Sequence, residues 1–97
     1  MKNTLNFLTF KTVELNNKGK ESETSYGYRF FDDHHNSYNN SFETWSDLTN
    51  EIFKDEEIDF DKVMSIVEED EIFKYAREDF DGIYINGDFY NWDGEKE

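Results

Sequence analysis

Asn86-Gly87 lies between two short apolar runs, and no other feature of the sequence constrains the fold as strongly. Both residue types tolerate the positive φ that a two-residue turn requires, so residues 82–92 are predicted to form a β-hairpin. The turn pairs Tyr84 with Phe89 and thereby sets the register of the hairpin. Tyr84 and Phe89 then share one face, and the other face is formed by Ile83, Ile85, Tyr90 and Trp92.

The N-terminal part of the sequence predicts a second hairpin. Residues 3–15 and 21–31 both carry alternating apolar side chains, and an Asn-Asn-Lys-Gly turn at residues 16–19 separates them. In the first strand the apolar residues change parity after Phe7. This change indicates either burial on both faces of the strand or a β-bulge.

A helix is predicted after the second hairpin strand. Residues 32–41 are polar and show no hydrophobic period, so they are expected to form a loop. Ser41 is expected to be the N-cap of a helix over residues 42–54, because apolar side chains recur there at a helical spacing.

Residues 55–81 hold 12 of the 24 acidic residues and two hydrophobic stripes that are out of phase with each other. One stripe ends at Val67, and the next begins at Ile72 on the opposite side of what would be the same helix. A break at residues 68–70 lets both stripes reach one core, so the stretch is predicted to form two short helices. Their expected N-caps are Asp59 and Asp70.

These elements are predicted to assemble into one domain of the α+β class that spans residues 1–97. The expected order is ββαααββ, in which the two hairpins form a four-stranded antiparallel sheet and the helices pack on one face. A chain of 97 residues suits one modest core. Residues 93–97 are charged and are predicted to be a flexible tail.

The sequence contains no recognisable catalytic or metal-binding pattern. The Asp-Asp-His-His run at residues 32–35 gathers metal ligands, but adjacent histidines point apart and no further ligand stands at a recognised spacing. The acidic run from Asp55 does not match a calcium loop, because Phe60 occupies the position that requires glycine. With no cysteine and no nucleophile-elbow motif, we expect no enzymatic activity, no metal and no cofactor.

The formal net charge of −14 restricts the class of partner. Such a chain repels nucleic acid and anionic membranes, so we expect it to bind neither directly. It attracts basic surfaces, with an affinity that falls as salt rises. An alternative interpretation is that the charge only keeps a chain with 18 aromatic residues soluble. The N-terminus lacks the apolar run of a signal peptide, and no stretch reaches the ~18 apolar residues of a membrane span, which predicts a cytoplasmic protein.

A partner-binding surface is predicted where acidic side chains recur along the helices. Carboxylates three or four residues apart on a helix lie roughly 5–6 Å apart, similar to successive phosphates of one nucleic-acid strand. Tyr38, Tyr75 or Tyr84, if exposed, are expected either to imitate stacked bases or to anchor the core of the interface. The predicted surface comprises Glu43, Asp47, Glu51, Asp55, Glu56, Glu57, Asp59, Asp61, Glu68, Glu69, Asp70, Glu71, Glu78, Asp79 and Asp81.

The small size, the high negative charge, the absence of cysteine and the acidic residues gathered on short helices resemble the DNA-mimic inhibitors that phages and plasmids use against host defence. These include anti-CRISPR and anti-restriction proteins. The resemblance implies a non-enzymatic protein in the host cytoplasm that binds a defence nuclease or another basic nucleic-acid-binding effector and blocks its channel. The same features are similar to immunity proteins and antitoxins that cover a nuclease toxin, and an acidic adaptor domain is a further alternative. The exposed face of the final hairpin is a candidate contact for a homodimer.

Overall fold

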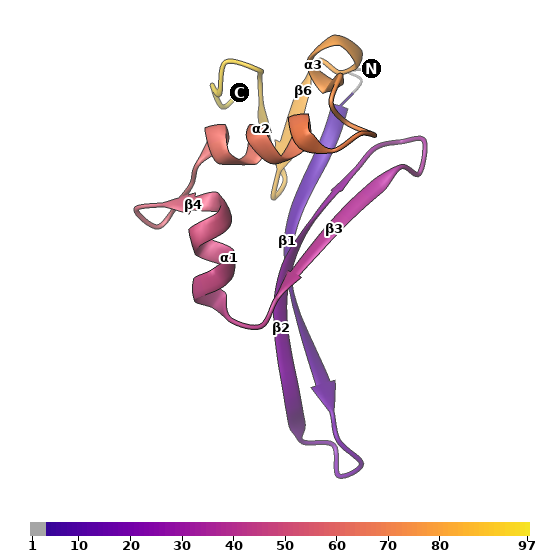
Figure 1. Cartoon of the computed structure of the whole chain (residues 1–97), viewed down its shortest axis with the longest axis vertical. Helices are drawn as coiled ribbons and strands as arrows, with labels where there is room; N and C mark the ends of the chain where they lie inside the picture. The colour runs from indigo at the N-terminus through magenta and orange to yellow at the C-terminus, as the bar shows by residue number, and fades with distance from the viewer. Residues whose placement is uncertain (1–3) are drawn as a thin grey trace.

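The computed structural model describes residues 4–97, which form an α+β unit built on one main sheet. The strand order in this sheet is β3-β2-β1-β6-β7 (Figure 1). A two-stranded hairpin, β4-β5, lies between the first two helices in the sequence. The elements are β1 (Thr4–Leu15), β2 (Glu21–Phe31), β3 (Ser37–Phe42), α1 (Trp45–Ile52), β4 (Phe53–Lys54), β5 (Glu57–Ile58), α2 (Phe60–Glu69), α3 (Ala76–Asp79), β6 (Gly82–Ile85) and β7 (Asp88–Tyr90).

The predicted four-stranded antiparallel sheet is wrong, because the main sheet has five strands and is mixed. The two predicted hairpins are present, but β6 pairs with β1 in parallel, from Thr4 opposite Gly82 to Phe7 opposite Ile85. The chain crosses over through α1, α2 and α3 before it returns beside the start of β1, and a crossover of this length permits parallel pairing. A hydrophobic pattern within each hairpin carries no information about this long-range choice.

The fifth strand, β3, lies in the segment that was predicted to be a loop. It pairs with β2 along its whole length, from Tyr26 opposite Phe42 to Phe31 opposite Ser37. Its polar composition conceals an alternation in which Tyr38 and Phe42 are half-buried while Asn39 is exposed. Polar residues are tolerated because β3 is an edge strand with only one paired neighbour.

Both hairpin turns are confirmed. Asn86 and Gly87 adopt φ values of 50° and 92°, and Tyr84 lies opposite Phe89 as predicted. The Asn86 side chain also ties this turn to the sheet, because its Oδ1 accepts a hydrogen bond of 2.9 Å from the backbone N–H of Thr9. In the first hairpin the register shifts between Glu14 and Leu15 rather than after Phe7.

The parity change in β1 therefore reflects apolar side chains on both faces of the strand. Leu5 and Phe7 are fully buried on the side of the helices, whereas Leu8 on the opposite face is 44% exposed. The predicted start of this strand at Asn3 lies outside the described residues.

The break between two acidic helices is confirmed, although the helix ends differ from prediction. Asp59 is the N-cap of α2 and accepts hydrogen bonds from two backbone N–H groups. Asp70 accepts from the N–H groups of Ile72 and Phe73, but it caps a run of turns, and α3 begins only at Ala76. The first helix has Thr44 as its N-cap in place of Ser41, because the chain remains extended in β3 as far as Phe42.

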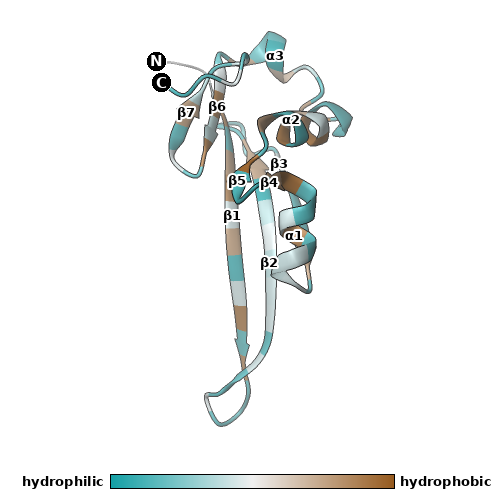
Figure 2. Cartoon of the chain, turned by 90° about the vertical axis from the view of Figure 1, so that its left-hand side faces the viewer, coloured by the Kyte–Doolittle hydropathy of each residue, from teal (hydrophilic) through white to brown (hydrophobic). Residues whose placement is uncertain are grey.

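One hydrophobic core lies between the main sheet and the helices. Its fully buried members include Phe7 and Phe30 from the sheet and Leu48, Val63 and Phe73 from the helical part. The outer half of the β1–β2 hairpin projects beyond the helices, and hydrophobic and hydrophilic residues alternate along β1 (Figure 2). The molecule is therefore elongated, with extents of 48 × 32 × 24 Å.

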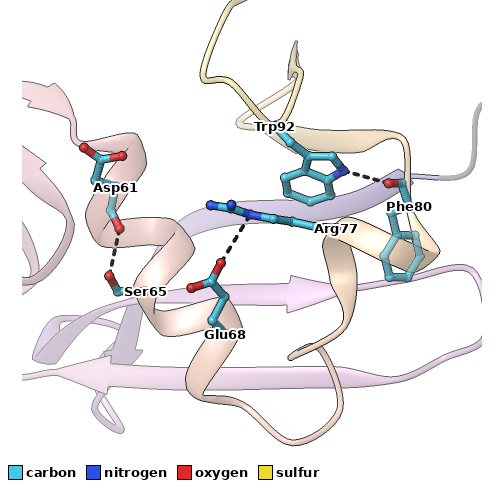
Figure 3. Close-up of polar contacts among 6 residues, drawn as sticks. All are labelled: Asp61, Ser65, Glu68, Arg77, Phe80 and Trp92. Atoms are coloured by element: carbon cyan, nitrogen blue, oxygen red, sulfur yellow. Dashed lines mark hydrogen bonds and ion pairs between the residues drawn. The ribbon is translucent and has the colours of Figure 1, made fainter.

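Residues 93–97, predicted to be a flexible tail, fold back along β7. The backbone N–H of Glu97 donates to the carbonyl of Phe89 at 2.9 Å, and Tyr90 forms a β-bridge with Lys96. The Trp92 indole links the segment after β7 to the end of α3, because its Nε1 donates a hydrogen bond of 2.7 Å to the Phe80 carbonyl (Figure 3).

Candidate acidic binding surface

The net charge of the chain comes entirely from its second half. Residues 1–42 contain five acidic and five basic residues, whereas residues 43–97 contain 19 acidic and five basic residues. The boundary falls at the end of β3, so the segment that contains the three N-terminal strands is neutral as a whole, and the segment that contains the helices and the final hairpin carries the charge of −14. Acidity is thus a property of one part of the fold.

Four carboxylates meet around a cleft of about 550 Å³ at the C-terminal end of α2, which we call the joint cleft. Glu51 reaches it from α1, and Glu69, Asp70 and Glu71 come from the end of α2 and the turn that follows. The other lining residues, which we call the floor, are mainly aromatic and aliphatic and comprise Tyr28, Tyr38, Asn40, Ile66 and Ile72.

Tyr28 gives the floor of the joint cleft its electrostatic character. The side chain is 1% exposed, and burial raises the pKa of its hydroxyl to about 12. The Asn40 side-chain amide donates a hydrogen bond of 3.3 Å to this hydroxyl. The floor therefore stays neutral at physiological pH, and the lining residues supply four carboxylates and no basic side chain.

A second group of carboxylates lies at the β4–β5 turn, which we call the tip cleft. Asp55 and Glu56 form the turn with φ values of 52° and 69°, a left-handed conformation that is unfavourable for Glu. They line a cleft of about 450 Å³ together with Trp45 and Phe53. The Trp45 indole is 49% exposed and packs edge-on against Phe53, with ring centroids 5.7 Å apart. An exposed indole beside two carboxylates suits a cationic side chain.

The third group joins the helical part to the projecting hairpin. Glu43 lines a cleft of about 410 Å³ with Glu14 of β1 and Glu23 of β2. Glu14 and Glu23 lie directly opposite each other in the antiparallel pair, an arrangement in which like charges repel. Neither residue belongs to the predicted surface, although the turn predicted at residues 16–19 brings the two strands that carry them together.

Several of the predicted site residues have structural partners. Asp59 and Asp70 cap the starts of a helix and a turn through their side-chain oxygens. Glu68 forms an ion pair with Arg77 at 3.2 Å across the joint between α2 and α3 (Figure 3). Both of these side chains are about half exposed, so the pair contributes little to stability.

The remaining predicted residues do not line any of the three clefts. Asp47, Glu57 and Asp61 are exposed on α1, β5 and α2. Farther along the chain, Glu78 and Asp79 lie on α3 and Asp81 precedes β6. The predicted tyrosines also separate: Tyr38 lines the joint cleft, Tyr75 is 55% exposed, and Tyr84 lies on the opposite face of the sheet.

The Asp-Asp-His-His run is part of a turn. Asp32 is buried, and its carboxylate accepts hydrogen bonds from the N–H of His34 and from both the N–H and the side-chain amide of Asn36. Over residues 4–97 no three potential metal ligands of the His, Cys, Asp and Glu type come together. The part of the chain that the structure describes also contains no helix long and apolar enough to span a membrane.

No protein-family model, curated protein or solved structure matches this chain.

Proposed function

We propose that this protein is a non-enzymatic inhibitor whose acidic surface occupies a basic nucleic-acid-binding site on another protein, such as a nuclease or a defence effector. The observation that carries the proposal is the placement of the whole net charge on residues 43–97, where it surrounds clefts with aromatic walls. Glu51, Glu69 and Glu71 are exposed, and in the described residues no ion pair neutralises them.

The physical basis is the one that nucleic acid itself uses. Closely spaced carboxylates, like phosphates, hold cations near them, and these cations are released when Lys and Arg side chains of a basic groove take their place. The ion pairs formed are strong when they are charge-assisted hydrogen bonds. The joint cleft adds a neutral aromatic floor beneath its four carboxylates, so that it fits the aliphatic stem of an arginine as well as its charge. This combination favours a protein partner over simple cations.

The proposed mode of action is that of the phage and plasmid DNA-mimic inhibitors which the sequence resembles. The protein acts in the cytoplasm of the host cell, binds its target in equimolar amounts and leaves no room for the nucleic acid. Because no reaction is involved, inhibition ceases when the protein is diluted below the concentration of its target.

Charge reversal at the joint cleft tests the proposal. The variant Glu51→Lys/Glu69→Lys/Glu71→Lys keeps Asp70, because Asp70 holds the following turn. Its matched control is Glu21→Lys/Asp33→Lys/Asp93→Lys, which makes the same change in net charge at exposed positions outside the three clefts. Both variants and the parent are used to capture basic proteins from cell lysate at about 0.1 M and 0.5 M salt.

We expect the parent and the control to capture a nucleic-acid-binding protein and to abolish its nucleic-acid binding when added in equimolar amounts. The joint-cleft variant should bind it at least ~10-fold more weakly, a loss of about 1.4 kcal/mol. Equal capture and inhibition by the joint-cleft variant would refute the location of the site. A captured protein that still binds nucleic acid normally would indicate an adaptor domain.

An immunity protein or antitoxin is the second candidate, and the apolar floor of the joint cleft favours it. Interfaces for one cognate partner concentrate their binding energy in well-packed aromatic and aliphatic pockets, and Tyr38, Ile66 and Ile72 provide such a surface. This function predicts a single nuclease that stays bound in about 0.5 M salt, whereas a general mimic loses its partners as salt rises.

A further inference from the structure

The face of the main sheet opposite α1 and α2, which we call the outer face, has an apolar centre of its own. Leu8, Phe10, Phe31, Tyr84 and Phe89 form this centre, as the pairing of Leu8 with Arg29 and of Asn6 with both Phe31 and Tyr84 shows. None of the five belongs to the core cluster that packs against the helices. Leu8 and Tyr84 are 44% and 37% exposed.

The aromatic side chains of the outer face are already held in place. The Phe10 ring lies over Gly27 and the Phe89 ring over Gly82, so closely that a Cβ at either glycine would run into the ring. Tyr84 packs edge-on against Phe89 with centroids 5.3 Å apart, and the Arg29 guanidinium lies 5.2 Å from the centre of the Phe31 ring. A surface ordered before binding loses little conformational entropy when a partner covers it.

Charge distinguishes the outer face from the acidic half of the molecule. From Thr4 to Thr12 of β1, and at the paired positions of the other described strands, the outward side chains include no carboxylate. Carboxylates border this face at its ends, where Glu14 and Glu23 lie in the projecting hairpin and the Glu97 backbone pairs with Phe89 of β7. Water-facing positions of antiparallel strands are usually polar. Here the apolar centre and Arg29 are surrounded by neutral polar side chains in place of carboxylates: Asn6, Thr12, Ser25, Ser37, Asn39 and Ser41.

We propose that the outer face is a homodimer interface in which two copies pack sheet against sheet. A second chain of net charge −14 meets the least repulsion on a surface that lacks carboxylates, which favours a second copy as the occupant. A two-fold axis at this interface points both sets of helices away from each other, because α1 and α2 cover the opposite side of each sheet (Figure 1).

The size of the outer face suits a small, weak dimer interface. Outside the projecting hairpin, β3, β6 and β7 contribute six, four and three residues. With about seven residues each from β1 and β2, a spacing of about 4.8 Å between strands and a rise of about 3.3 Å per residue, the flat sheet covers roughly 430 Å² before side-chain relief is added. A standard interface buries about 800 Å² on each partner. Two sheets packed in this way lie about 10 Å apart, so that Leu8 and Tyr84 of each copy reach the other.

The mass of the purified protein in solution, measured by light scattering after gel filtration, tests the proposal. At about 200 µM we expect twice the chain mass of 11.7 kDa for the parent. Leu8→Glu places a carboxylate at the centre of the interface and should give the monomer mass. Leu15→Glu is the matched control, because Leu15 is a 63% exposed leucine of the same strand in the projecting hairpin, and it should remain dimeric.

The dependence on salt distinguishes dimerisation through the outer face from binding through the acidic surface. Dimerisation should be maintained or strengthened between about 0.1 and 0.5 M salt, because salt screens the repulsion between the two chains. Circular dichroism checks that the Leu8→Glu variant is folded. If it is not, Arg29→Glu places a carboxylate at an exposed position of the same face and should also give monomers. A parent that stays monomeric at about 200 µM in 0.5 M salt, or a folded outer-face variant that dimerises like the parent, would overturn the proposal.

Discussion

The neutral half and the acidic half of this molecule share one core but present opposite surfaces. Residues 1–42 carry balanced charge and contain β1, β2 and β3, which supply Leu8, Phe10 and Phe31 of the outer face. Residues 43–97 contain the helices and the final hairpin, carry all of the net charge and supply Tyr84 and Phe89. A bulk value of −14 therefore describes neither half. The difference teaches that a strongly acidic protein can keep the centre of one sheet face free of carboxylates, and that such a surface is as informative as the acidic one.

Truncating a side chain of the core that the two halves share should have the largest effect on the free energy of unfolding. Phe7 is fully buried and packs against Phe30 and Tyr28, with ring centroids 4.7 and 5.7 Å away. Phe7→Ala should lower the free energy of unfolding by about 3–5 kcal/mol. Urea unfolding followed by circular dichroism and by the fluorescence of Trp45 and Trp92 should show one transition, whereas two transitions would mean that the halves fold separately.

Leu15→Ala is the control for this experiment. Leu15 is 63% exposed in the projecting hairpin, so its truncation should change the free energy of unfolding by no more than about 0.5 kcal/mol.

High pH should weaken the contact between the two halves through Tyr28, which lies at their boundary beneath the joint cleft. Burial raises its pKa to about 12, above the value of 10.0 for a free tyrosine. Between these two values the unfolded chain releases the proton and the folded chain keeps it, so stability is lost as pH rises from 10.0 towards 12.

The expected loss is up to about 2–3 kcal/mol, since each unit of pKa difference corresponds to about 1.4 kcal/mol. Urea unfolding at pH values on either side of this window measures it. In Tyr28→Phe the drop should be smaller by that amount, and an unchanged pH dependence in this variant would show that Tyr28 is not responsible.

Removal of single carboxylates should separate those that build the acidic half from those that are available to a partner. Asp59→Ala removes the N-cap of α2 and should cost about 1 kcal/mol. Glu57→Ala, at an exposed position two residues earlier, should leave the free energy of unfolding within about 0.5 kcal/mol of the parent. Thermal unfolding of both variants provides the measurement, and equal destabilisation would contradict this division.

Among the changes considered, salt concentration should have the smallest effect on the free energy of unfolding. Repulsion within the acidic half should be screened between about 0.02 and 0.5 M salt, raising the free energy of unfolding by about 0.5 kcal/mol. The gain should shrink in Glu51→Gln/Glu69→Gln/Glu71→Gln, because these three carboxylates meet at the joint cleft. Urea titrations at both salt concentrations compare the two proteins, and the same gain in both would place the repulsion elsewhere.

Local features of this fold could be predicted from the sequence, and long-range ones could not. The Asn86-Gly87 turn, the first hairpin and the break after α2 follow from backbone preferences and hydrophobic phase, which act over a few residues. The parallel pairing of β1 with β6 depends on where the crossover returns, and β3 hides its alternation in polar residues.

The candidate site was predictable to the same extent. The acidic residues at the joint were identified from the run at residues 68–71, but the meeting of Glu51 with Glu69 requires the packing of α1 beside α2. The helical spacing of apolar residues over 42–54 predicted one buried side, whereas Trp45, the first residue of α1, is 49% exposed. The apolar outer face was visible only as a change of parity after Phe7.

Displacement of bound proteins from a DNA resin tests the proposed function most directly. Basic proteins from a cell lysate are loaded on double-stranded DNA at about 0.1 M salt, and the resin is washed with the purified protein at equal ionic strength. The proposal predicts that the parent and Leu8→Glu release a nucleic-acid-binding protein as a complex, while Glu51→Lys/Glu69→Lys/Glu71→Lys does not. Release of nothing by the parent, or equal release by the triple variant, would contradict it.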